Sequence, residues 1–195
     1  MEKISEMGKN ATVFVDKNAE LANYARVYAH ETIAAYAYFL VGFLVPFTLG
    51  HPQVLVGSVV NAVLVLSAMQ FGFKKTLPLL FAPSLGVLAR GLVFGPFTPF
   101  LLVMLPFIWV GNALLVLIVS KLYRERKSNY WISLGAGAGV KSGFLFSSAY
   151  VLVAMSIIPP LFLATMGLDQ LVTALIGGIA AFGIYKTGLM KFLRA

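Results

Sequence analysis

Arg90 is the most conspicuous polar residue in the apolar stretches of this sequence. It stands at the end of a proline-broken apolar segment, shortly before the turn Gly95-Pro96-Phe97-Thr98-Pro99. A guanidinium group presents a planar set of donors that matches a carboxylate or a phosphate. Arg90 is therefore a candidate for holding an anionic group of a ligand. The alternative is an arginine whose long side chain carries its charge out of an apolar layer into water.

Asn61 and Asn112 stand within long apolar runs, where an amide is costly unless it is hydrogen-bonded. At about 1.5 Å per helical residue, Asn61 lies roughly 10 Å and Asn112 roughly 20 Å below the start of its run. An amide offers a donor and an acceptor together to a heterocycle or an amide ligand. The same group also forms hydrogen bonds that hold neighbouring helices together. Both interpretations stay open for both asparagines.

Further candidates come from turns and from aromatic side chains. Gln53 and Asp169 stand in or beside turns between apolar runs, where polar residues are often simply solvated. Phe97 and Trp109 could stack on a flat ligand. Aromatic residues make up 13% of this chain, so packing is the competing explanation for both rings.

The composition places the chain in a lipid bilayer. Hydrophobic residues make up 59% of its 195 positions and charged residues 11%, against about 45–50% and about 25% in soluble domains. We expect a polar N-terminal segment, 1–30, on the cytoplasmic side or at the interface, followed by one membrane domain, 31–195. The net charge of +8 does not indicate nucleic acid, because basic residues that flank apolar runs report membrane orientation.

The apolar runs predict an all-α bundle of six transmembrane helices. Most runs approach the ~20 residues that a helix needs to cross the hydrocarbon layer. The third is short and broken by Pro78, Pro83 and Gly86, as is tolerated where a segment is buried in protein or lines a wet cavity. The expected spans are 32–49, 54–73, 76–90, 99–120, 142–166 and 170–186.

Basic residues predict the orientation of this bundle. With the N-terminus inside, all but one of the 15 lysines and arginines fall in inner segments, and this count includes Lys141. Only Arg90 falls outside. This bias predicts that both termini are cytoplasmic and that the protein is a multi-pass protein of the plasma membrane.

Nothing in the sequence predicts an enzyme. His30 and His51 would lie on opposite sides of the membrane, and no zinc-protease or serine-hydrolase motif is present. The chain has no cysteine, so thiolate chemistry is excluded. We therefore expect no cofactor and no bound metal, and ATP hydrolysis cannot come from this chain alone.

Over about residues 19–193 the chain resembles the substrate-binding S component of energy-coupling factor (ECF) transporters. The shared features are the length, six spans with both ends inside and a polar outer rim. The segment PSLGVLARGLVFGPFTPFLLVMLPFIWVGN, 83–112, resembles members of that group whose substrate is not known. The resemblance implies capture of a vitamin-like micronutrient at the outer face, and association with a transmembrane T subunit and two cytoplasmic ATPases. The nickel- and cobalt-type members of that family use an N-terminal histidine, whereas this chain begins Met1-Glu2-Lys3, so the resemblance does not imply a metal cargo.

The resemblance also implies a docking face of small residues on the first span. Ala25, Ala29 and Ala37 stand at multiples of four residues from one another, but Ile33 interrupts the series. Ala34 belongs to a neighbouring patch of small residues. Small residues equally permit close packing within an ordinary helix bundle.

These observations lead to three hypotheses. In the first, the chain is the binding subunit of an ATP-driven importer, with a site formed by Arg90, Asn61, Gln53, Phe97, Trp109, Asn112 and Asp169. In the second, it is a stand-alone secondary carrier or channel, which generally needs a titratable group near the midplane. The predicted spans contain no such group. In the third, it is an assembly subunit without a ligand.

Overall fold

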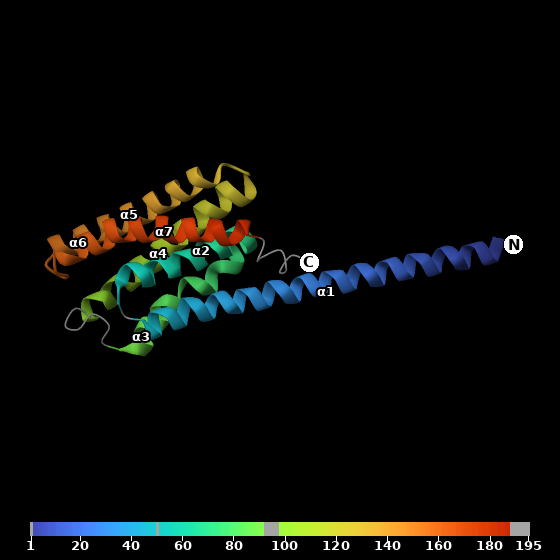
Figure 1. Cartoon of the computed structure of the whole chain (residues 1–195), viewed down its shortest axis with the longest axis horizontal. Coiled ribbons are helices and arrows are strands. Elements are labelled where there is room, and N and C mark those ends of the chain that lie inside the picture. Colours follow the sequence, from blue (N-terminus) through green and yellow to red (C-terminus); the bar gives the residue numbers. More distant parts are fainter. Residues whose placement is uncertain (1, 50, 92–97, 188–195) are drawn as a thin grey trace.

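The computed structural model describes the backbone of residues 2–49, 51–91 and 98–187, and side chains from Glu20 onward outside the same gaps. Every element within these ranges is helical (Figure 1). Their order is α1 (Glu2–Thr48), α2 (Gln53–Thr76), the 3-10 helix η1 (Leu77–Leu80), α3 (Ala82–Arg90), α4 (Thr98–Val119), the π-helix η3 (Ser120–Glu125), α5 (Tyr130–Ala154), α6 (Leu161–Met166) and α7 (Leu168–Lys186).

Helix α1 joins the polar N-terminal segment and the first apolar run in one continuous helix of 47 residues. Its apolar part, Glu20–Thr48, is long enough to cross a membrane. In Figure 1 the N-terminal half of α1 projects beyond the bundle, while its C-terminal half packs along it. Leu21, Tyr24 and Tyr28, which the helical pattern places on one side, are all more than half exposed.

Helix α2 forms the centre of the bundle, with α1, α4 and α7 packed around it (Figure 1). Nearly every residue from Val60 to Met69 is buried, as expected for a helix that is apolar on all sides. Near its end Gly72 adopts φ +77°, a conformation that side chains disfavour, and the helix kinks there.

The expected short, proline-broken segment is present as η1 followed by α3, which has only nine residues. Pro78 and Pro83 each occupy the start of a helical element, where a missing N–H is tolerated. Helix α3 packs against the C-terminal part of α1. Gly86 makes this approach close, because a Cβ atom there would collide with the Phe43 carbonyl oxygen.

The prediction for the fifth span was wrong at both ends. We expected a span over 142–166, with Lys141 in a cytoplasmic loop. Instead α5 begins at Tyr130, where the side chain of Asn129 accepts a hydrogen bond from the Trp131 amide and caps the helix. It ends at Ala154, before Pro159 and Pro160, and the short α6 follows. The glycine-rich run 135–143 is therefore helical, and Lys141 lies inside the bundle.

Five stretches of the described chain are long and apolar enough to cross a membrane. One of them, Gln53–Arg90, contains α2, η1 and α3 together. By length and composition this stretch is a single candidate span, although the sequence predicted two spans within it. The others are Glu20–Thr48, Thr98–Glu125, Tyr130–Ala154 and Leu161–Lys186. The chain is therefore an all-helical protein with the composition and helix lengths of a multi-pass membrane bundle.

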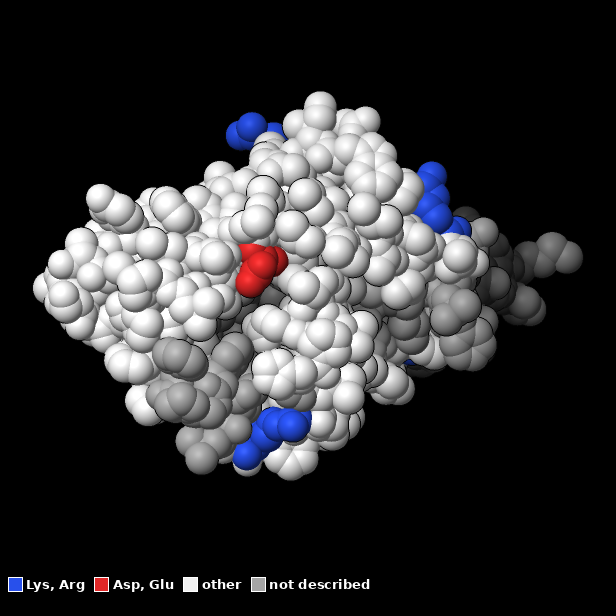
Figure 2. All heavy atoms as spheres, turned by 60° about the vertical axis from the view of Figure 1, so that its left-hand side comes forward, with Lys and Arg blue, Asp and Glu red and all other residues white. Residues whose placement is uncertain are grey.

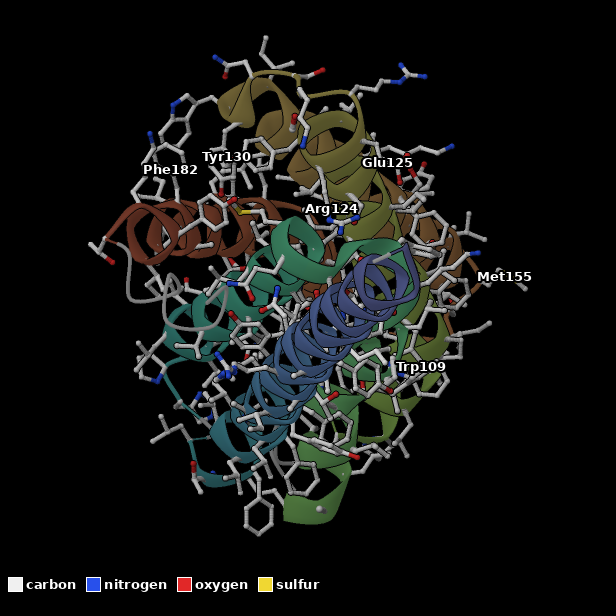
Figure 3. All side chains as sticks on the ribbon, turned by 90° about the vertical axis from the view of Figure 1, so that its right-hand side faces the viewer. Trp109, Arg124, Glu125, Tyr130, Met155 and Phe182 are labelled. Carbon is white, nitrogen blue, oxygen red and sulfur yellow. The ribbon has the colours of Figure 1, made fainter. Side chains whose placement is uncertain are left out.

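Aromatic rings join α5 to α7 at the end of the bundle where α5 begins. The Tyr130 and Phe182 rings stack with centroids 4.7 Å apart, side by side in Figure 3. The Tyr130 hydroxyl donates a hydrogen bond of 2.6 Å to the Gly178 carbonyl oxygen. At the same end Arg124 extends from η3 to Gly72, whose missing Cβ leaves room for the guanidinium (Figure 3).

Helices α2 and α7 also pack closely against each other. A Cβ atom on Gly177 would collide with the Ser58 carbonyl oxygen and lie 2.8 Å from the Ala62 amide nitrogen. Backbone atoms of a helix cannot move aside as the end of a flexible side chain can. This contact therefore requires glycine.

We predict that Gly177→Ala destabilises the protein by about 1–3 kcal/mol, because the added methyl group forces α2 and α7 apart. Gly183→Ala is the matched control in the same helix, since a Cβ atom there would meet nothing within 4 Å. Unfolding in mixed micelles gives the free energy of unfolding of both variants. Equal stability of the two variants would contradict the close packing described for α2 and α7.

Candidate functional site

Lys141 is the most unusual residue of the bundle. It lies near the middle of α5, roughly 17 Å along the helix from Tyr130, and is only 1% exposed. Lysine is almost never fully buried unless it is paired, and a charge at membrane depth is expensive. A titratable group in this position makes Lys141 a candidate functional residue.

A short chain of hydrogen bonds links Lys141 to two other helices. The Lys141 Nζ donates to Asn61 Oδ1 on α2 at 2.6 Å. The Asn61 Nδ2 donates to Thr173 Oγ1 on α7 at 3.2 Å and to the Gly57 carbonyl oxygen at 2.9 Å. Asn61 is 1% exposed and Thr173 2% exposed, so the whole chain of hydrogen bonds lies in the interior.

No carboxylate balances the charge of Lys141. Within the described residues the only ion pair joins Lys75 to Glu31, at the level where α2 ends. An ammonium group can donate three hydrogen bonds, and the described part of the chain accepts one of them. When it is protonated, Lys141 therefore retains two donors and an uncompensated positive charge.

These groups border a cavity of about 100 Å³. We call it the polar cavity, because six of its lining residues are polar and come from five helices. Around them the walls are apolar, with Val56, Val60, Leu105 and Ile108 among the lining side chains. The six polar residues are Gln53, Asn61, Ser84, Asn112, Lys141 and Gln170.

Asn112 is the second group of the polar cavity with unused hydrogen-bonding capacity. It is 2% exposed, and no described residue forms a hydrogen bond with its side-chain amide. The amide is not fully enclosed, because Ser58 Oγ is the one fully buried polar side-chain atom without a partner among the described residues. Because Asn112 lines the polar cavity, its amide is available to whatever occupies that space.

The polar cavity faces the end of the bundle where α1 ends and α2 and α7 begin. Leu49, Gln53 and Gln170 line it at that end, while Asn112 and Lys141 lie deep inside. Figure 2 looks toward this end and shows a mostly uncharged surface, with a hollow beside the single acidic group in view. A ligand entering there would pass two glutamines before it reaches the ammonium group.

The structure brings together three of the residues expected to bind substrate. Asn61, Gln53 and Asn112 all line the polar cavity. Asp169 lies in the first turn of α7, beside the lining residue Gln170 but not in the wall itself. Phe97 lies outside the described residues.

Arg90 and Trp109 lie beside the polar cavity rather than in its wall. The Arg90 guanidinium is exposed and donates to the carbonyl oxygens of Phe47 and Thr48. It therefore satisfies the C-terminal end of α1, where carbonyl groups have no partner in the helix. The Trp109 indole packs edge-on to Phe81 at 5.1 Å and donates to Ser84 Oγ at 2.9 Å. That hydroxyl lines the cavity, so Trp109 positions a cavity residue.

The four alanines expected to contact a partner do not share one exposed face. Ala25, Ala29 and Ala37 are exposed. Ala34 is 3% exposed and belongs to the core cluster around α2. Its surface is not available to a second protein, and a docking role stays a prediction for the other three.

Sequence reasoning missed Lys141 and Ser84, and it placed Gln170 only as a polar residue of an outer turn. The signal for Lys141 was present in the helix length. A helix that begins at the capping residue Asn129 and ends before Pro159 encloses Lys141 near its centre. We placed Lys141 in an inner loop because its positive charge fitted the inner side.

No protein-family model, curated protein or solved structure matches this chain. The interpretation of the polar cavity therefore follows from its own chemistry. An ammonium group with spare donors, an unpartnered amide and apolar walls suit a small polar or anionic organic molecule. No cluster of three metal-binding side chains occurs among the residues that the structure describes.

We predict that Trp109→Phe lowers stability by about 1 kcal/mol, because it removes the hydrogen bond to Ser84 and keeps an aromatic ring at the site. Trp131→Phe is the control, since the Trp131 indole N–H has no hydrogen-bond partner in the described structure and its ring is 50% exposed. Thermal unfolding in detergent compares the two. A larger loss for Trp131→Phe would show that the Trp109 contact does not position Ser84.

Proposed function

We propose that this protein is the membrane-embedded substrate-binding subunit of an ATP-driven importer, and that it captures a small organic micronutrient at the outer face. The polar cavity carries this proposal. Six polar side chains from five helices converge in an apolar bundle, and two of them have unused hydrogen-bonding capacity. Such groups are expensive in a membrane protein unless a ligand or water uses them.

The proposal places six crossings in the membrane, with η1 and α3 as the short third one. Arg90 at the end of α3 contacts the end of α1, and Lys75 before η1 pairs with Glu31 far back along α1. The segment between these two contacts, η1 and α3, therefore runs back across most of the distance that α2 spans. Because it packs against α1, its proline-broken backbone is covered by protein.

Charge distribution supports cytoplasmic termini. Lys74, Lys75, Arg124, Lys127 and Lys186 all stand at the end of the bundle opposite the mouth of the polar cavity. With Lys141 moved to the interior, Arg90 is still the only basic residue expected outside. The positive-inside rule then places the mouth of the cavity on the outer face.

A transmembrane T subunit and two cytoplasmic ATPases would supply the energy, as the resemblance to ECF S components implies. Helix α1 offers an exposed apolar surface for such a partner, because Leu21, Tyr24, Ile33 and Tyr36 are each at least 60% exposed. Lipid would cover the same surface in the free subunit.

Lys141 favours a second candidate, a stand-alone secondary carrier. Such carriers need a titratable group at membrane depth, and we had expected none in this chain. Proteoliposomes containing only this protein separate the two functions. Uptake driven by a proton gradient would support the carrier, whereas uptake that requires added ATPases and T subunit would support the importer. Failure of both, with no bound small molecule, would indicate an assembly subunit without a ligand.

We predict that mass spectrometry of the purified protein detects a bound small organic molecule, and that Asn112→Leu weakens its binding about tenfold. The reason is the loss of hydrogen bonds worth about 1.4 kcal/mol from the amide to the ligand. Asn129→Leu is the matched control, because Asn129 caps α5 at the far end of the bundle. It should lower stability and leave the affinity unchanged. Equal affinities of wild type and Asn112→Leu would contradict a ligand in the polar cavity.

The absence of native cysteines permits a direct test of orientation. We predict that a membrane-impermeant maleimide labels His51→Cys in intact cells, and labels Arg126→Cys only after the membrane is permeabilised. Both residues are exposed and stand at opposite ends of the bundle. The reverse labelling pattern would place the polar cavity on the cytoplasmic side and rule out capture from outside.

A further inference from the structure

The most informative feature of the polar cavity is a buried lysine without a counter-charge. Lys141 is buried, its one hydrogen-bond acceptor in the described structure is the neutral Asn61 carbonyl oxygen, and no described carboxylate lies within 4.0 Å. Breaking a buried ion pair is strongly destabilising, because the remaining charge is left uncompensated. The ligand-free site thus resembles a buried ion pair from which the acidic partner has been removed.

We propose that the ligand is a monoanionic carboxylate and that its carboxylate group binds between Lys141 Nζ and the side-chain amide of Asn112. This inference rests on the proposed binding function and specifies its substrate class. A carboxylate accepts several hydrogen bonds. The two spare Lys141 donors and the unpartnered Asn112 amide can supply them, and the carboxylate also neutralises the ammonium group.

The charge of the site selects a monoanion. Lys141 is the only cationic residue in the wall of the polar cavity, and the other five polar lining residues are neutral. A carboxylate therefore brings the site to zero net charge. A phosphate dianion would leave a buried negative charge, and an organic cation would meet a positive one. A neutral amide would occupy the space without compensating Lys141.

The volume of the cavity limits which part of the ligand binds at Lys141. A space of about 100 Å³ holds a carboxylate and a few carbon atoms. Pockets that enclose a whole drug-sized ligand are roughly 300–1,000 Å³. Leu101, Leu105 and Ile108 form the apolar wall around the acid group. A larger ligand would have to extend past Gln53 and Gln170 toward the outer end, so its acid group enters first.

A panel of matched acids and amides tests the substrate class. Propionate, butyrate and benzoate are compared with propionamide, butyramide and benzamide, with ethyl phosphate as the dianion, at pH 7 and constant ionic strength. A phosphate monoester is mostly dianionic at this pH, because its second pKa is about 6. Thermal unfolding of the full chain in nanodiscs, titrated with each compound, gives the apparent affinity. We expect each acid to bind at least tenfold more tightly than its amide, and ethyl phosphate to bind more weakly than propionate.

Two variants of the full chain assign the acid to Lys141. Lys141→Met keeps the length of the side chain and removes its charge, so it should abolish the tenfold preference for acids over amides. Asn61→Asp places a carboxylate where Asn61 Oδ1 now accepts from Lys141 at 2.6 Å. It should raise the thermal stability of the ligand-free protein and abolish acid binding, because the counter-charge is then built in. A merely structural lysine would give no preference for acids over amides that Lys141→Met could abolish.

Each outcome has a distinct meaning. If the amides bind as tightly as the acids, or if Arg90→Gln rather than Lys141→Met removes the preference for acids, the assignment to Lys141 is overturned while the binding function stands. Tighter binding of ethyl phosphate than of propionate overturns the carboxylate class. If none of the panel binds and no small molecule is carried through purification, both this inference and the proposed function fail.

Discussion

The electrostatics of one buried lysine constrains the rest of the site. In a membrane interior an ammonium group must be surrounded by oxygen atoms, because the surrounding medium solvates it poorly. Asn61 supplies one such oxygen and is itself fixed by Thr173 on α7. That link depends on close helices, since a Cβ atom on Gly57 would lie 3.0 Å from Thr173. Small residues between α2 and α7 thus position the acceptor that Lys141 uses.

The sequence predicted the parts of the site whose signal is the cost of burying a polar group. Asn61 and Asn112 were expected in the interior because apolar residues surround them on both sides, and both line the polar cavity. Gln53 was expected from its place at the start of a run. These inferences need only a count of the apolar residues that flank each polar residue in the sequence. In a membrane bundle a long apolar run indicates a spanning helix, so the count indicates which polar residues lie at membrane depth.

Other parts could not be derived from local patterns. Arg90 was a candidate for holding an anionic ligand group, and its guanidinium donates to the carbonyl groups that end α1, more than forty residues away in the sequence. Lys141 was assigned to an inner loop because of its charge, and the glycines around it lower helix propensity. Packing against α4 overrides that propensity, since Gly137 and Gly111 allow α4 and α5 to approach each other. Tertiary contacts decided both cases.

The length of α1 has a mechanical consequence. At about 1.5 Å per residue its 47 residues span roughly 70 Å, more than twice the ~30 Å of hydrocarbon that one helix has to cross. The Lys75–Glu31 pair fastens it to α2 partway along, and the helix continues beyond that point in Figure 1. A rigid arm of this kind amplifies rotation. A tilt of about 10° at the pair would sweep its tip, about 44 Å away, through about 8 Å.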